Sequence, residues 1–145
     1  MKIEYNNLYT HFVFTTYNRL SLIPEKNRER IEKYITGIVG YNLSKLYAIY
    51  ANPDHVHFLI SRSPSKSEEE IATTIANSSS SFINKNKLAV GKFAWQQSAS
   101  AFSVSKQDVD GICKYILSQP DHHKKETFDE EYQRFMKYYQ NTLQR

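Results

Sequence analysis

Two histidines, His55 and His57, stand two residues apart in the stretch HVHFLIS. Side chains alternate along a β-strand, so both imidazoles would point to one face and the apolar residues around them to the other. Their Cα atoms would lie roughly 6 to 7 Å apart, and the two ring tips can converge on one cation. The pair predicts a metal site; the alternative that it leaves open is two exposed or hydrogen-bonded histidines on a sheet.

A second pair, Tyr115 and Gln119, is four residues apart in a segment of helical character, so the two side chains would share a helix face. A tyrosine hydroxyl is a weak nucleophile at its free pKa of about 10 and needs a cation or a base beside it. The glutamine carbonyl can supply a neutral oxygen to a metal. The alternative is a core tyrosine and a surface glutamine, in a chain that holds eleven tyrosines.

Several cationic side chains are candidates for contact with a nucleic-acid backbone. They are Arg19, Arg62, Lys85, Lys87 and His122. The net charge of +4 permits a nucleic-acid partner without requiring one. Aromatic residues make up 14% of the chain and can stack on unpaired bases, although most aromatics in any domain belong to the core. For each cation, a solvated position on a loop or a helix end is the alternative.

The elements that must position these residues follow from the periodicity of the sequence. Alternating β-branched and aromatic residues predict strands over 8–16, 45–51, 55–61 and 99–105. Helices are predicted over 25–39, 67–86 and 107–119, followed by a last amphipathic helix with Phe128, Tyr132, Phe135 and Tyr139. Ser67 and Glu70 form a capping box, Gly40 is a plausible stop, and Pro120 marks an end or a break at Gln119.

The order β-α-β-β-α-β, with two trailing helices, predicts an α+β fold. It matches the ferredoxin-like, RRM-like antiparallel sheet with helices on one face, followed by a C-terminal helix that carries Tyr115 and by a trailing helix. The 145 residues are predicted to form a single domain, 1–145. This fold hosts many functions and decides none of them.

The composition of the chain indicates the cellular compartment in which we expect the protein. The chain has one cysteine, so no intrachain disulfide is possible and a reducing cytoplasm fits. The segment Met1 to Thr10 lacks the apolar run of a signal peptide or anchor, and no apolar stretch approaches the length of a membrane span. We therefore expect a cytoplasmic protein without a membrane partner.

Taken together, the motifs resemble those of one family. NPDHVHFLI at 52–60, FAWQQ at 93–97, AFSVS at 101–105 and YILSQPDHHKK at 115–125 are similar to segments of the single-tyrosine HUH transposases. These are the small insertion-sequence transposases and their REP-associated relatives. The resemblance extends from about Tyr9 to Tyr139.

The resemblance implies roles for particular residues. His55 and His57 match the metal-binding histidines, Gln119 the third ligand and Tyr115 the nucleophile. Such enzymes form a 5′-phosphotyrosine link, leave a free 3′-OH, and join strands by the reverse attack. They use Mg²⁺ or Mn²⁺, form homodimers and recognise hairpins in single-stranded DNA. In the insertion-sequence members, the tyrosine helix commonly completes the active site of the partner subunit. A covalent ester keeps the bond energy, so no nucleotide cofactor is expected.

The chain departs from the family pattern at four places. Asn52 stands where members often have Met, and Ser78 to Ser81 stand where members often carry a lysine or arginine. Pro120 after the glutamine is unexpected, and the C-terminal end is short. These differences affect the expected mode of DNA binding and the movement of the tyrosine helix.

Four functions are compatible with the sequence. The first two are an active transposase and a domesticated nuclease that cuts chromosomal palindromes. The third is a binding module that holds single-stranded nucleic acid without cutting, for which Tyr115→Phe would behave like the unaltered chain. The fourth is a small-molecule-binding domain, against which the histidine pair and the lack of a Gly-rich phosphate loop both weigh.

Overall fold

The fold is built on a four-stranded antiparallel sheet, seen in a computed structural model that describes residues 1–122 and 127–143. Within these ranges the side chains of residues 122, 135 and 138–143 are left undescribed. The strand order is β2-β3-β1-β4. The strands are β1 (Tyr9–Thr15), β2 (Lys45–Ala51), β3 (His55–Ser61) and β4 (Ser100–Val104). All three strand pairs are antiparallel, which confirms the predicted sheet.

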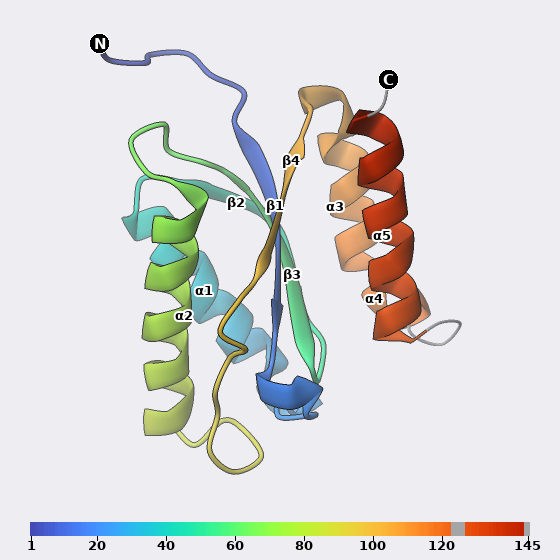
Figure 1. The fold of residues 1–145 in the computed structure, drawn as a ribbon. Coiled ribbons are helices and arrows are strands. Elements are labelled where there is room, and N and C mark those ends of the chain that lie inside the picture. Colours follow the sequence, from blue (N-terminus) through green and yellow to red (C-terminus); the bar gives the residue numbers. More distant parts are fainter. Residues whose placement is uncertain (123–126, 144–145) are drawn as a thin grey trace.

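Helices cover both faces of the sheet and make three layers (Figure 1). On one side lie α1 (Arg28–Tyr41) and α2 (Glu68–Lys85). On the other lie α3 (Val109–Leu117), the short α4 (Gln119–His122) and α5 (Phe128–Leu143). Three 3₁₀ turns complete the described elements: η1 (Tyr17–Arg19), η2 (Glu25–Asn27) and η3 (Lys106–Asp108). The α1 and α2 crossovers give the predicted ferredoxin-like arrangement.

The two faces of the sheet differ in chemistry because side chains alternate along each strand. On the α1/α2 face, Phe12 of β1 stacks on Phe58 of β3 with ring centroids 5.1 Å apart, inside the main apolar core. The opposite face carries three buried histidines, His11, His55 and His57. Burying polar rings costs free energy unless they are hydrogen-bonded. This face of the sheet is therefore the candidate location of a functional site.

Two predicted helix ends need correction. The first helix does not stop at Gly40 but continues to Tyr41, and the chain turns at Leu43 with φ of 63°. The segment from Glu25 is a 3₁₀ turn, and the α-helix itself begins at Arg28. Gly40 is therefore a residue within the helix rather than its stop.

The helix that carries Tyr115 ends earlier than predicted. It stops at Leu117, Ser118 caps it with φ of −99° and ψ of 17°, and Gln119 begins α4. Pro120 accounts for the break, because a proline has no N–H to donate to the carbonyl four residues earlier and its ring clashes with that carbonyl. The capping box of Ser67 and Glu70 is confirmed at the start of α2.

Across the described ranges, no helix combines the length and the apolar character that crossing a bilayer requires.

Candidate active site

The site is centred on His55 and His57 of β3. Their strand neighbours in β1 are Thr15 and Val13, so both histidines lie over the middle of the sheet. Each is 1% exposed, and the ring centroids are 5.2 Å apart with the planes at 79°. The predicted placement of both imidazoles on one face is therefore confirmed.

Each imidazole is oriented by a partner at its Nδ1 atom. The Nδ1 of His55 lies 2.7 Å from Oδ1 of Asp54, and the Nδ1 of His57 lies 2.9 Å from Nε2 of the buried His11. In metal sites the second ring nitrogen is typically held in this way by a carboxylate or another polar group, which fixes the tautomer. The Nε2 atoms of both rings therefore point to one common position, opposite their Nδ1 partners.

The carboxylate of Glu131, on α5, occupies the position that both Nε2 atoms face. Oε1 of Glu131 lies 2.6 Å from Nε2 of His57 and 3.6 Å from Nε2 of His55, and the residue is fully buried. Burial alone would raise the pKa of Glu131, but the hydrogen bonds from His55 and His57 outweigh it and hold that pKa far below its ordinary value. Burial would lower the pKa of His55, but its hydrogen bonds with Asp54 and then with Glu131 outweigh burial and raise that pKa.

These three residues form a donor set suited to a divalent cation. The ligand atoms of His55, His57 and Glu131 all lie within 4.8 Å of one another. Two imidazole nitrogens and one carboxylate oxygen suit a first-row divalent ion such as Mn²⁺, and the hydrogen-bonded Nδ1 atoms support that use. The residues present therefore fit a metal site.

Tyr115 of α3 faces this cluster. Its ring centroid is 5.8 Å from that of His57, with the planes nearly perpendicular at 84°. Burial, and next the Glu131 carboxylate, raise the pKa of Tyr115 far above its ordinary value. Gln119 and the Arg134 guanidinium act in the opposite direction. The structure thus places the predicted nucleophile beside the predicted metal histidines of the same chain.

Gln119 also reaches the site, although the helix is broken before it. The side chain is fully buried, and its Oε1 accepts a hydrogen bond of 3.1 Å from Nδ2 of Asn52. The same Asn52 nitrogen lies 3.2 Å from Nε2 of His55. Asn52, noted above as a departure from the family pattern, therefore links Gln119 to His55.

Of the predicted DNA contacts, Arg19 lies at the rim of the site. It forms an ion pair with Asp129, and its Cζ lies 5.2 Å from the centroid of the Phe128 ring. The Phe128 ring in turn lies 4.1 Å from that of His55. Arg19, Asn18, Gln96 and Tyr132 are among the residues that line a hollow of about 530 Å³ next to Phe128.

Among the cationic candidates whose side chains the structure describes, Arg62, Lys85 and Lys87 do not converge on the site. Arg62 follows the far end of β3 and pairs with Glu68 at 2.7 Å. Lys85 ends α2, and Lys87 follows it, on the opposite side of the sheet. His122 ends α4, but its side chain lies outside the described residues. The prediction of DNA contact by these four residues stays untested.

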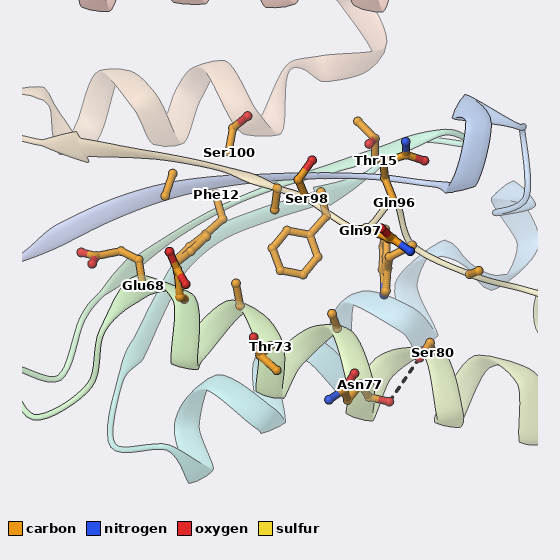
Figure 2. Close-up of a pocket in the computed structure, with 18 of the residues that line it drawn as sticks. Phe12, Thr15, Glu68, Thr73, Asn77, Ser80, Gln96, Gln97, Ser98 and Ser100 are labelled. Atoms are coloured by element: carbon orange, nitrogen blue, oxygen red, sulfur yellow. Dashed lines mark hydrogen bonds between the residues drawn. The ribbon is translucent and has the colours of Figure 1, made fainter.

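A larger groove, of about 630 Å³, lies on that opposite side (Figure 2). Its lining comes from α2, through Thr73, Asn77 and Ser80, and from the chain leading into β4, through Gln96 and Gln97. Aromatic residues of the core, Phe12, Phe14, Phe93 and Trp95, also line it. None of the described residues that line this groove is a histidine, so the groove is separate from the histidine cluster.

Sequence reasoning missed Glu131 and His11, and each left a local signal. Glu131 stands three residues after Phe128 and directly before Tyr132, on the apolar stripe of the last helix. A carboxylate there must be paired, because burial of an unpaired charge is very costly. His11 lies in the first strand on the face opposite Phe12 and so is the third histidine on the polar face of the sheet.

With this geometry in place, the sequence relationships are clear. Residues 4–119 match the family model described as "Transposase IS200 like". This span covers most of the chain, which therefore belongs to the IS200-like transposase family. The matched span includes His55, His57, Tyr115 and Gln119 but ends before α5 and Glu131. No curated protein matches the chain significantly.

Two solved structures share the fold. One is a candidate transposase from Deinococcus radiodurans R1, with a TM-score of 0.63 and 20% identity over 82% of this chain and 98% of that chain. The other is a REP-associated tyrosine transposase bound to a REP hairpin, with a TM-score of 0.61 and 15% identity over 85% of this chain and 73% of that chain. At these identities the likeness shows the fold.

Proposed function

We propose that this transposase cleaves and rejoins single-stranded DNA through a covalent 5′-phosphotyrosine intermediate on Tyr115, using a divalent cation. The observation that carries the proposal is the position of Tyr115, with its ring 5.8 Å from that of His57 in a buried histidine and carboxylate cluster. Family membership accounts for the DNA-processing role, and this contact supports Tyr115 as the residue that attacks.

The cation, Mg²⁺ or Mn²⁺, would be held by Nε2 of His55, Nε2 of His57 and the carboxylate of Glu131, with Oε1 of Gln119 as a further donor. These residues would hold a cation that, when bound, would supply Lewis-acid polarisation of the scissile phosphate. Asp54 and His11 keep the two imidazoles in the tautomer that leaves Nε2 available. Asn52 holds the Gln119 oxygen beside His55.

In the covalent step, the Tyr115 hydroxyl oxygen attacks phosphorus. The new bond joins that oxygen to phosphorus, the bond between phosphorus and the 3′ oxygen breaks, and the phenolic proton passes through solvent to the departing 3′ oxygen. The DNA is left with a free 3′-OH and with its 5′ phosphate on Tyr115. Attack by another 3′-OH reverses the step and joins strands without a nucleotide cofactor.

We further propose a hairpin in single-stranded DNA as the substrate. The REP-associated tyrosine transposase that shares the fold is bound to a REP hairpin, which supports this substrate class. Arg19 and the polar hollow beside Phe128 would receive the strand next to the site. Homodimerisation is implied by the family resemblance, whereas the contact between Tyr115 and His57 of one chain supports a site assembled without a partner.

A covalent-adduct assay tests the proposal. The protein is incubated with Mn²⁺ and single-stranded hairpin DNA from the genome that flanks its gene, and products are resolved on a denaturing gel. We expect a protein–DNA adduct that Tyr115→Phe abolishes. Tyr34→Phe, which alters a tyrosine on the far side of the sheet, is the matched control and should leave the adduct unchanged. DNA binding without any adduct would instead favour a non-cutting binding module.

A further inference from the structure

Arg134 is a cation beside the proposed nucleophile that the family match leaves unexplained. Its Cζ lies 5.4 Å from the centroid of the Tyr115 ring, and its side chain is exposed. It belongs to α5, beyond the matched residues 4–119.

The position of Arg134 follows from the docking of α5. Residues three apart on a helix share a face, so Glu131 and Arg134 are directed to the same layer of the molecule. Glu131 is fixed by its contact of 2.6 Å with His57, and Tyr132 is fixed by a hydrogen bond of 2.7 Å between its hydroxyl and Ser100. These two contacts hold the turn of α5 that delivers Arg134 to Tyr115.

We propose that Arg134 binds the scissile phosphate beside Tyr115 and holds it for attack. The inference rests on the proposed function. An anionic phosphodiester gains charge density as the phenolic oxygen approaches, and a preorganised cation stabilises that charge. A guanidinium offers paired N–H donors whose fork matches two phosphate oxygens. It stands over the ring of the attacking residue, so a phosphate that reaches the Tyr115 hydroxyl is within reach of this long side chain.

Nearby described cations are less suited to this role. The Arg19 guanidinium lies over the ring of Phe128, not over that of Tyr115. Lys114 directly precedes Tyr115 on α3, and adjacent helical residues do not share a face. Lys137 is exposed one turn further along α5, so it offers the same charge on the same helix without the contact to Tyr115. Lys137 is therefore the matched control.

The experiment compares Arg134→Gln, Arg134→Lys and Lys137→Gln in the adduct assay, at saturating hairpin DNA and Mn²⁺. We expect Arg134→Gln to slow adduct formation by about 100-fold, as loss of one transition-state donor does elsewhere. Arg134→Lys should recover part of the rate, because it keeps the charge and loses the fork. Lys137→Gln should react like the unaltered chain. Mn²⁺ affinity and melting temperature should be unchanged in all three variants.

A substrate without charge at the scissile position tests whether Arg134 acts by contacting the phosphate or only by supporting the structure of the site. Once the cleavage position is mapped, the scissile phosphodiester is replaced by a methylphosphonate, which lacks the negative charge. If Arg134 contacts the phosphate, the ratio of the unaltered rate to the Arg134→Gln rate should shrink towards one on this substrate. An equal ratio on both substrates would overturn the inference, as would an unchanged rate for Arg134→Gln or an equal loss for Lys137→Gln. Absence of an adduct from the unaltered chain would overturn the proposed function itself.

Discussion

His11 and His57 are hydrogen-bonded to each other in the interior, with Nε2 of His11 at 2.9 Å from Nδ1 of His57. Burial, and next the neighbouring His57, hold the pKa of His11 well below its ordinary value, so His11 is neutral at physiological pH. A neutral His11 can accept a hydrogen bond from the Nδ1–H of His57, while the Nε2–H of His57 donates to the Glu131 carboxylate in the metal-free protein. A bound cation would take the place of that Nε2 proton. The strand β1 thus sets the tautomer of a residue on β3.

This contact gives the first prediction. His11→Leu removes the acceptor and should weaken Mn²⁺ binding by about 10- to 100-fold, the range found when such supporting partners of metal ligands are lost. His11→Gln keeps an acceptor oxygen and should retain most of the affinity. Titration calorimetry with Mn²⁺ measures both variants. Equal losses in the two variants would show that packing of the His11 ring, rather than its hydrogen bond, matters.

The second prediction concerns the Glu131 carboxylate in the metal-free protein. Its pKa in the fold lies below the ordinary carboxyl value of 4.5, so its contribution to stability is present above that pH and is lost as the pH falls through the lowered pKa. Glu131→Gln should therefore lower the free energy of unfolding by about 1.5–3 kcal/mol near pH 6. The difference from the unaltered chain should narrow as the pH falls below 4.5 towards 3.

Urea denaturation in the presence of a chelator at several pH values measures this difference. Glu4→Gln, which alters an exposed residue of the N-terminal segment, serves as the control and should give no pH-dependent difference. A Glu131→Gln penalty that stays constant down to pH 3 would contradict the ion-pair origin, since a carboxylate kept ionised by the histidines must lose stabilising free energy once the unfolded chain takes up a proton at this position.

The parts of the structure that sequence predicted well depend on local periodicity. Alternation along 55–61 predicted both the strand and the shared face of His55 and His57, because side-chain direction in a strand follows from the backbone alone. The strand order followed from two crossovers and one hairpin, since few topologies satisfy that order of elements.

The parts that sequence missed depend on contacts between distant segments. Glu131 lies 74 residues from His57 along the chain and reaches it only because α5 folds back over the sheet. His11 and His57 are 46 residues apart and meet only through the register of β1 with β3. No local sequence pattern predicts that residues so far apart along the chain come into contact. Periodicity offered only indirect clues: the charge of Glu131 within an apolar stripe, and the position of His11 on the strand face opposite Phe12.

The third prediction concerns Pro120. Pro120 has no N–H to donate to the carbonyl of Ile116, and its ring would clash with that carbonyl, so α3 ends before it and a break at Ser118 separates α3 from α4. The Gln119 side-chain oxygen then reaches Asn52. Pro120→Ala should allow α3 to continue through residue 119 and should displace that oxygen from the site. We expect Mn²⁺ affinity to fall several-fold while the fold is retained. Pro24→Ala, at a proline ahead of η2, is the control, and unchanged affinity in Pro120→Ala would mean that Gln119 does not depend on the break.

The last prediction asks whether one chain makes a complete site. Tyr115 and His57 of the same chain face each other, so the structure supports cleavage in cis. His57→Ala and Tyr115→Phe should each abolish adduct formation, and an equimolar mixture of the two variants should remain inactive. If the tyrosine helix instead completes the partner's site, a mixed dimer pairs an intact Tyr115 with an intact His57, and the mixture recovers activity. Recovery would thus assign Tyr115 to the partner's site, and α3 would have to leave the position it holds against β2 and β3.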